Sequence, residues 1–317
     1  MALLSPFIHA AIFTWDGGGE GLWEDPTRWL PQQVPGENDT AVIGGREDTV
    51  IRVDGGRSVQ TLVLSNPNAT LLLQGSVNHG QAILNVAHGF VNEGTIELSS
   101  EISSYEARLT VSGGALTNAP GGVIRISEGT GGPRQLNASL DNRGLLEVSR
   151  DLTFNGTVAN HGTVHLAEGR MLTTPSAMTW THRQGAITGT GTLALADSST
   201  FVLEEDFTPG GFILDAPNLT INGPARLLGP VTGEFLIRNW TINAEVVVTG
   251  DLRIDGVVNF NSPLAVSAGK TLRLMGSVNH GQAILNVAHG FVNEGTIELS
   301  SEISSYEARL TVSGGAL

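Results

Sequence analysis

Short runs in which apolar and polar residues alternate occur along much of the chain, and most of them follow a turn-forming segment that contains glycine. The clearest are VNEGTIEL (91–98), TNAPGGVIRI (117–126), DNRGLLEV (141–148), ANHGTVHL (159–166) and TGTGTLAL (188–195). A period of two residues is typical of a β-strand with one buried face. The pattern therefore predicts many short strands joined by tight turns.

The glycines before these strands recur at intervals typical of a β-solenoid. Gly94, Gly122, Gly144, Gly162 and Gly191 are separated by 28, 22, 18 and 29 residues, with a mean near 24. Each interval is long enough for one coil of short strands and turns, and neighbouring coils of a sheet lie about 4.8 Å apart. We expect an all-β fold, namely a right-handed parallel β-helix that forms an elongated rod.

Alternation within these five strands places two aliphatic side chains of each strand on the same face. We expect these ten side chains to stack in columns inside the solenoid: Ile96, Leu98, Ile124, Ile126, Leu146, Val148, Val164, Leu166, Leu193 and Leu195. On the outer face, coils stacked in register place Arg125 between Glu97 and Glu147. Opposite charges at strand spacing stabilise a sheet, so an ion-pair column is predicted there.

An asparagine precedes the glycine in four of the five coils. Asparagine tolerates the left-handed backbone of tight turns, and identical amides stacked along a fibre axis form hydrogen-bonded ladders. Repetition at a turn favours this geometric role over an asparagine-lined ligand site. We predict a structural ladder of Asn92, Asn118, Asn142 and Asn160.

A second, much longer repeat is superimposed on the coils. Gly75–Leu116 and Gly276–Leu317 are identical at all 42 positions, with an offset of 201 residues. A fixed period indicates units that bury their apolar faces on one another. The sequence is consistent with a natural array, which we favour, or with a deliberate duplication. An array predicts that TNAPGGVIRIS or a near copy follows Leu317.

The repeats suggest a division of the chain into four parts. Residues 1–13 are interpreted as an edge left by processing or engineering that contributes at most one strand, and residues 14–59 as an N-terminal cap. Residues 60–274 are predicted to form the solenoid coils, and residues 275–317 the start of the next repeat. Such a cap is expected because an exposed terminal coil is an unpaired sheet edge.

The predicted cap contains three of the five tryptophans of the chain, Trp15, Trp23 and Trp29. Buried indoles close a core with their large apolar area, whereas exposed indoles bind sugars by stacking. Their setting among Gly, Pro and Asp favours an apolar lid. Carbohydrate binding by the same three residues is the weaker alternative.

Composition excludes several classes of protein. The formal net charge of −14 argues against nucleic acid or an anionic membrane surface as a partner. The longest mostly apolar stretch, MALLSPFIHAAIF, has 13 residues, too few to span a bilayer, and it lacks a basic n-region. With 0 Cys, disulfides are excluded.

Candidate chemistry is sparse. The acidic triplet Glu204, Glu205 and Asp206 lies in a predicted loop and is at most a weak cation site, because adjacent residues of an extended chain point in opposite directions. His-Gly pairs recur at turns in several coils, which favours turn chemistry over catalysis. No catalytic residue, metal site or cofactor is predicted, and we expect that the chain is not an enzyme.

One segment resembles a known kind of protein. Trp15-Asp16-Gly17-Gly18-Gly19, then Trp23, Asp25-Pro26, Trp29, Pro35-Gly36 and Asp39 before the strand TAVI are similar to the N-terminal module of large secreted bacterial β-solenoid surface proteins, of the autotransporter-passenger and filamentous-haemagglutinin kinds. The resemblance implies a parallel β-helix, export to the cell surface, and a role as adhesin, stalk or filament. Its expected partners are adjacent copies of itself and surface glycans. The alternative is a β-helix that binds or cleaves polysaccharide.

Overall fold

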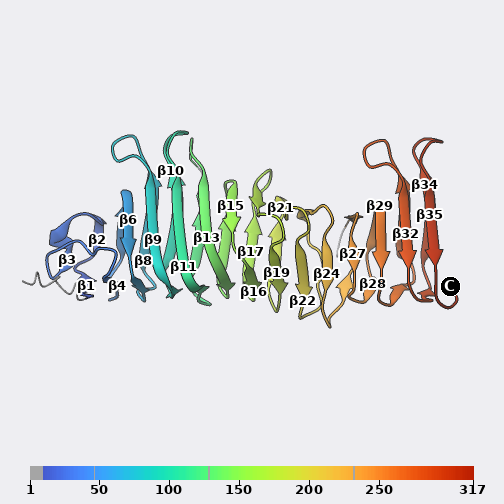
Figure 1. The fold of residues 1–317 in the computed structure, drawn as a ribbon, viewed down its shortest axis with the longest axis horizontal. Coiled ribbons are helices and arrows are strands. Elements are labelled where there is room, and N and C mark those ends of the chain that lie inside the picture. Colours follow the sequence, from blue (N-terminus) through green and yellow to red (C-terminus); the bar gives the residue numbers. More distant parts are fainter. Residues whose placement is uncertain (1–9, 46, 128, 231–232) are drawn as a thin grey trace, which may run out of the picture. The chain divides into compact units, whose positions relative to one another are not determined.

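The structure is a computed structural model that describes residues 10–317 apart from residues 46, 128, 231 and 232. The chain is all-β and forms a β-solenoid of about 12 turns with parallel sheets, which confirms the fold class predicted from the alternation. It divides into two compact units, Met1–Gly156 and Thr157–Leu317, which are described separately. Within each unit, strands of successive turns lie side by side (Figure 1).

One face of unit 1 is a parallel sheet in continuous register. Thr95 lies opposite Thr70 on one side and Val123 on the other, and Val123 lies opposite Leu145, so consecutive turns take 25, 28 and 22 residues. These lengths agree with the glycine spacing. The strands are β2 (Gly19–Leu22), β5 (Thr49–Val53), β8 (Ala69–Gly75), β10 (Thr95–Ser100), β12 (Val123–Ile126) and β14 (Leu145–Val148).

The remaining strands of unit 1 complete each turn, and the longest of them bend at register shifts so that one strand serves two faces. Apart from one antiparallel pair at the N-terminal end, their named pairings are also parallel. They are β1 (Ile12–Trp15), β3 (Trp29–Leu30), β4 (Thr40–Ile43), β6 (Gly55–Val59), β7 (Thr61–Leu64), β9 (Ala82–Asn92), β11 (Ala107–Asn118), β13 (Arg134–Asn142) and β15 (Leu152–Asn155).

Unit 2 is built in the same way from shorter strands. Most of its turns take 18 to 23 residues, as in the series Thr200, Thr220, Thr241 and Asn259. Its strands in the first half are β16 (Val158–Asn160), β17 (Thr163–Leu166), β18 (Met171–Thr173), β19 (Thr179–His182), β20 (Ala186–Gly189), β21 (Thr192–Ala194), β22 (Thr200–Leu203), β23 (Ile213–Asp215) and β24 (Thr220–Asn222).

The second half of unit 2 contains the strands that lead into the 42-residue copy. They are β25 (Leu227–Leu228), β26 (Glu234–Arg238), β27 (Thr241–Ile242), β28 (Val246–Val248), β29 (Asp251–Phe260), β30 (Leu264–Val266), β31 (Thr271–Gly276), β32 (Ala283–Val287), β33 (Val292–Asn293), β34 (Thr296–Ser301) and β35 (Ala308–Val312). All their named pairings are parallel.

The aliphatic columns predicted for unit 1 are present. Ile96, Ile124 and Leu146 lie opposite one another in successive turns, and each is 0% exposed. Burying such a side chain stabilises a fold by about 1.5–3 kcal/mol relative to leaving it in water. The alternation of the strands therefore places their main stabilising contacts along the solenoid axis.

The prediction was wrong for the last strand of the series. In unit 2, Val164 lies opposite Ile187 of β20, not opposite Leu193. Leu193 and its strand β21 pair instead with β18 and β23 on another face. The glycine equivalent to Gly162 is Gly185, because Thr163 lies opposite Ala186, so Gly191 was assigned to the wrong corner of the turn.

The predicted charge column is confirmed on the outer face of unit 1. Arg125 lies opposite Glu97 in the preceding turn and Glu147 in the following turn. Its guanidinium is 2.9 Å from the Glu147 carboxylate and 3.9 Å from the Glu97 carboxylate. The side chain is 43% exposed, so these pairs contribute modestly to stability.

The N-terminal end of unit 1 combines a lid with the first solenoid strands. Strand β3 pairs antiparallel with β1 and follows a short 3-10 turn, Pro26–Arg28, capped by the Asp25 side chain. However, β4 already pairs parallel with β1 and β7, and β5 with β2 and β8. Parallel pairing is therefore already present within residues 14–59, the range predicted as the cap. Residues 1–9 of the predicted edge 1–13 lie outside the described residues, and Ile12 and Phe13 belong to β1.

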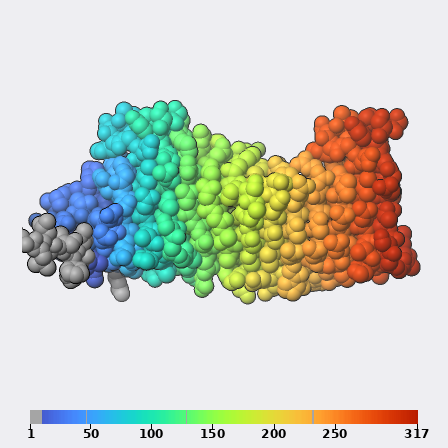
Figure 2. Space-filling model, viewed as in Figure 1, coloured from blue at the N-terminus to red at the C-terminus, as the bar shows by residue number. Residues whose placement is uncertain are grey.

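The two identical segments fold in the same way. In unit 1, Ala82 lies opposite Ala107 and Gly75 opposite Ser100; in unit 2, Ala283 lies opposite Ala308 and Gly276 opposite Ser301. Both copies contain the same tight hairpin, closed by Ser76–Gly80 in one and Ser277–Gly281 in the other. Figure 2 shows the loops of each copy projecting from their own unit, in cyan and in red.

None of the described residues belongs to a helix with the length and apolar character needed to cross a membrane.

Candidate functional site

The three tryptophans of the predicted cap form a buried cluster. The Trp29 ring lies edge-on to Trp15 and Trp23, with ring centroids 5.0 and 4.9 Å away. Trp23 and Trp29 are 0% exposed and Trp15 is 6% exposed, and the Trp29 indole N–H donates to the Trp23 carbonyl oxygen at 2.8 Å. Sugar stacking requires an exposed ring face. Their burial leaves no ring face open for such stacking, and the three indoles pack as an apolar cluster at the N-terminal end of unit 1.

The acidic triplet does not converge on a common point. The Glu204 carboxylate lies 2.9 Å from Arg183 Nε, whereas Asp206 accepts hydrogen bonds from Arg226, including one from Nε at 3.0 Å. These hydrogen bonds lower the pKa of the Asp206 carboxyl below its ordinary value. Glu205 is exposed between the two. Two of the three carboxylates are thus engaged by separate arginines, and the triplet is no cation site.

The asparagines of unit 1 form a hydrogen-bonded column at the corner of successive turns. The Asn92 amide donates to Asn118 Oδ1 at 2.8 Å, and the Asn118 amide donates to Asn142 Oδ1 at 2.9 Å. All three are 0% exposed. Asn160, in unit 2, is also 0% exposed and its amide donates to the Ala186 carbonyl at 3.4 Å. The side-chain N–H groups of Asn92 and Asn118 are bonded to protein oxygens, whereas Asn92 Oδ1 is buried without a hydrogen-bond partner among the described residues. Hydrogen bonds between buried amides of successive turns are typical of a structural element.

The glycine of the same motif is required by close packing. A Cβ placed on Gly144 would lie 2.1 Å from the Gly122 carbonyl oxygen, and one on Gly122 would lie 2.4 Å from that of Asn92. Any side chain at these positions would force adjacent turns apart. The glycine that recurs after the asparagine at this corner is therefore required by the close stacking of the turns.

Sequence reasoning missed a buried histidine in unit 2. His182 is 4% exposed, packs against Phe201 and Phe207, and its burial lowers its pKa to about 4. The alternation of inward and outward residues along β19 could have predicted this burial, because His182 falls on the same face as buried Trp180. It is a neutral core residue at neutral pH.

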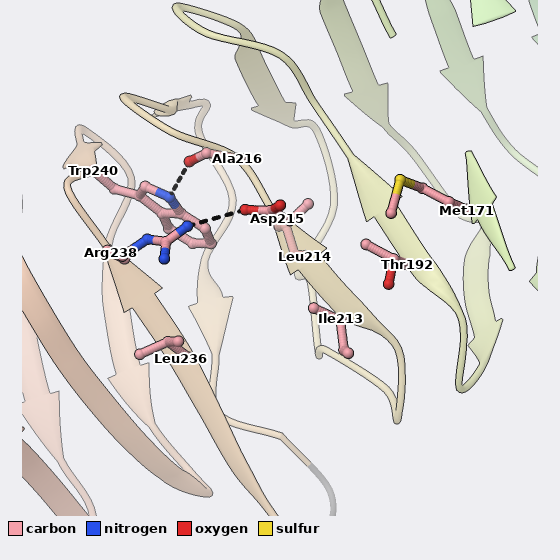
Figure 3. Close-up of a pocket in the computed structure, with 9 residues that line it drawn as sticks. All are labelled: Met171, Thr192, Ile213, Leu214, Asp215, Ala216, Leu236, Arg238 and Trp240. Carbon is pink, nitrogen blue, oxygen red and sulfur yellow. Dashed lines mark hydrogen bonds and ion pairs between the residues drawn. The ribbon is translucent and has the colours of Figure 1, made fainter. Parts of the chain in front are cut away.

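Unit 2 contains a pocket of about 300 Å³ beside β23 and β26. Outward-facing Met171, Thr192 and Ile213 lie opposite one another on β18, β21 and β23 and line one side (Figure 3). Leu236 and Arg238 of β26 line the other side. Met171, Ile213 and Leu236 are 39%, 59% and 37% exposed, so the pocket has an apolar rim.

The pocket lies where the ladder on this face is interrupted. Strand β23 pairs with β21 and strand β26 pairs with β29, but no pairing between β23 and β26 occurs in the described part of the chain. Two side-chain contacts bridge the gap (Figure 3): Arg238 lies 3.1 Å from the Asp215 carboxylate, and the Trp240 indole N–H donates to the Ala216 carbonyl at 2.7 Å. Trp240 is 2% exposed and fills the base.

The chemistry of this pocket favours recognition over catalysis. Its residues provide one carboxylate, one guanidinium and one hydroxyl, from Asp215, Arg238 and Thr192. Glycoside hydrolysis commonly uses two carboxyl groups on either side of the scissile bond, and the single carboxylate here is paired with an arginine. The arrangement suits a ligand with both apolar surface and hydrogen-bonding groups.

Comparison with protein-family models, with curated proteins and with solved structures finds no match for this chain.

Proposed function

We propose that the chain is a structural and adhesive repeat segment of a large extracellular bacterial surface protein, serving as a stalk or associating end to end with other copies. The observation that carries the proposal is the exact 42-residue repetition, because the two copies, Gly75–Leu116 and Gly276–Leu317, fold into the same turns with the same strand register. In such a fold each repeat contacts only its neighbours, so repeats can be added to lengthen the chain without changing the contacts of the others. The proposal assigns no catalytic activity to the chain.

The contacts between turns support a mechanical role for the chain as a stalk. Each turn of unit 1 is joined to the next by a backbone ladder, by aliphatic columns and by the column of Asn92, Asn118 and Asn142. Further asparagine pairs lie on outward positions, such as Asn137–Asn155 in unit 1 and Asn222–Asn243–Asn261 in unit 2, with separations of 2.7 to 2.9 Å. No bound group is needed for any of these contacts.

Unit 1 shows how one turn covers the turn before it. Leu98 of β10 is covered by β12 and is 0% exposed, whereas the equivalent Leu299 of β34 is 50% exposed. The edge of β34 and β35 therefore presents the surface that a further turn covers in unit 1. The proposed occupant of this edge is another turn of the same kind, from an adjacent repeat or another protomer.

Sedimentation velocity and negative-stain microscopy of the full chain test this assignment. Strings of particles are expected, and Leu299→Lys should convert them to single particles because a charge at the open edge cannot be buried cheaply. Leu236→Lys places the same charge on another half-exposed leucine of unit 2 and should leave the strings intact. Single particles of the parent chain at every concentration, or equal effects of the two variants, would rule out end-to-end association.

A separate assay tests the absence of catalysis. The chain is incubated with a panel of acidic and neutral polysaccharides, and new reducing ends are measured. No release is expected. Reproducible release by the purified chain would contradict the structural assignment and favour the polysaccharide-cleaving alternative.

A second candidate function, glycan binding, is favoured by the pocket of unit 2. Exposed Met171, Ile213 and Leu236 surround the Arg238–Asp215 ion pair, which combines apolar contact area with directional hydrogen bonding. Glycan-array binding that is lost in Arg238→Ala would support this function. Arg183→Ala, which removes another half-exposed, ion-paired arginine of unit 2, is the matched control and should bind as the parent chain does.

A further inference from the structure

Asp54 is a buried carboxylate without a hydrogen-bond donor. It follows β5 at the corner where Gly55 adopts a φ of 69°, and it is 2% exposed. Neither carboxylate oxygen has a hydrogen-bond partner among the described residues. Burying an ionised carboxylate without compensation is costly, and buried polar groups in native proteins are nearly always satisfied. The position therefore requires a compensating group.

Two other potential ligands point at this carboxylate from neighbouring turns. His79 Nδ1 lies 3.6 Å from Asp54 Oδ2 and 4.0 Å from Glu24 Oε1. One ligand atom from each of the three residues lies within 4.8 Å of the other two. Glu24 comes from the turn before Asp54, since Leu22 lies opposite Arg52 and the Trp23 N–H donates to the Arg52 carbonyl.

The nearby arginines leave the Asp54 oxygens unpaired. Arg52 is directed away from Asp54, with its guanidinium 2.7 Å from Glu20 Oε1 and hydrogen-bonded to Gln74. Arg57 lies 3.5 Å from Glu24 Oε2. That contact occupies the far oxygen of Glu24 and leaves Oε1 on the side of His79. Burial raises the pKa of Asp54, as does the Glu24 charge, whereas His79, Arg52 and Arg57 lower it.

Unit 2 contains the equivalent corner with different chemistry. Asp255 is 201 residues after Asp54 and is 1% exposed, but Arg253 donates to both of its oxygens, from Nε and from a terminal nitrogen, each at 3.1 Å. The residue opposite Asp255 in the preceding turn is Arg238, whereas the preceding turn of unit 1 supplies Glu24. The Arg238 guanidinium lies 3.1 Å from His280 Nδ1. The carboxylate of unit 2 is thus compensated by Arg253.

We propose that Glu24, Asp54 and His79 bind a divalent transition-metal cation, of which Zn²⁺ fits best. One imidazole nitrogen and two carboxylate oxygens are ligands that Zn²⁺ accepts at about 2.0–2.2 Å, and a water would complete four-coordinate geometry. Mn²⁺ shares this preference for nitrogen and oxygen donors. Bringing the three ligand atoms onto one ion requires small movements of Glu24 and His79, whose side chains are 30% and 40% exposed.

The hairpin that carries His79 is suited to such a movement. It is closed by two backbone hydrogen bonds between Ser76 and Gly80, at 2.9 and 2.8 Å, and the His79 N–H donates to Ser76 Oγ at 3.2 Å. The backbone of the hairpin is therefore fixed while the imidazole remains accessible. A bound ion would join this hairpin to the β5 corner and to the turn that contains the tryptophan lid, and so would stabilise the N-terminal end of unit 1.

Isothermal titration of the metal-free full chain with Zn²⁺ tests the proposal. One tight site is expected per chain. His79→Ala should weaken Zn²⁺ binding by about 100-fold or more, since it removes a direct ligand and loss of even an indirect partner costs 10–100-fold. His280→Ala removes the histidine of the identical hairpin in unit 2 and should leave the affinity unchanged. Ca²⁺, which prefers all-oxygen sites, should bind far more weakly than Zn²⁺.

A second variant separates metal binding from an ion pair within the cluster. Asp54→Asn should abolish tight Zn²⁺ binding while raising the melting temperature of the metal-free chain, because it removes the buried charge. Zn²⁺ should raise the melting temperature of the parent chain but not of Asp54→Asn. The proposal fails if the parent chain shows no Zn²⁺ site, or if His79→Ala and His280→Ala weaken binding equally.

Discussion

The two copies of the 42-residue segment allow the same mutation to be made in the same local sequence with and without a covering turn. Leu98 and Leu299 occupy equivalent strands, and each lies opposite a leucine of the preceding turn, Leu73 and Leu274 respectively. Leu98 is also covered by Ile126 of the following turn. The perturbation is Leu→Ala at one position or the other.

The structure sets the expected magnitudes. Leu98 is 0% exposed, so Leu98→Ala should cost about 3–5 kcal/mol, the sum of a transfer term and a cavity term. Leu299 is 50% exposed and has an open side, so Leu299→Ala creates no enclosed cavity and should cost about 1 kcal/mol, roughly half of the transfer term. The difference of about 2–4 kcal/mol corresponds to at least about a 30-fold difference in an opening equilibrium.

Hydrogen exchange measured by mass spectrometry provides the assay, because it reports the opening free energy of individual turns. Each substitution changes the mass of its own peptide, which also distinguishes two copies that otherwise yield identical peptides. Amides of β10 should lose at least 30-fold more protection in Leu98→Ala than amides of β34 lose in Leu299→Ala. Equal losses at the two positions would refute the argument that the following turn supplies the core of the preceding one.

Three further outcomes are expected. His182→Phe should flatten the pH dependence of melting: burial lowers the His182 pKa from 6.5 to about 4, so the parent chain should lose stability as pH falls from 6.5 to 4, by on the order of 3 kcal/mol. Gly144→Ala should lower the melting temperature sharply, whereas Gly121→Ala, where an added Cβ meets nothing within 4 Å, should be nearly neutral. Asn118→Ala should cost roughly 2–4 kcal/mol by leaving two buried amide partners unsatisfied, measured by hydrogen exchange of the adjacent turns.

Much of the fold was predictable because contacts in a solenoid form between successive turns, so the spacing of turn and strand signals along the sequence predicts them. The turns that contain asparagine and glycine, and the alternation after them, predicted the register of Ile96, Ile124 and Leu146 without knowledge of any distant contact. The prediction was wrong at Gly191, where a similar local pattern occurs at a different corner of the turn. Spacing alone does not identify the corner when turn lengths differ between neighbouring coils.

The functional positions were less predictable because they depend on which turn precedes them. Glu204, Glu205 and Asp206 are adjacent in sequence, yet the structure directs Glu204 and Asp206 to different arginines. Glu24, Asp54 and His79 are far apart in sequence and converge because turns stack. A signal was present in the segments Arg52–Gly55 and Arg253–Gly256, which share Arg-x-Asp-Gly at the 201-residue offset and thereby mark a repeated corner with a buried carboxylate.

The two corners show how a repeated scaffold can carry different chemistry at one position. The aspartate and the histidine are retained in both units, so these two residues alone do not define a site. The preceding turn differs between the units: it supplies Glu24, two residues after the Leu22 that lies opposite Arg52, in unit 1, and Arg238 opposite Asp255 in unit 2. In unit 1 the Glu24 carboxylate adds a potential ligand, and Arg52 binds Glu20 and Gln74 instead of Asp54. In unit 2 Arg253 donates to both oxygens of Asp255, and the Arg238 guanidinium lies against His280. In a stacked fold, the chemistry at a corner therefore depends on residues of the preceding turn. Segments with identical sequences can differ in their properties because the turns beside them differ.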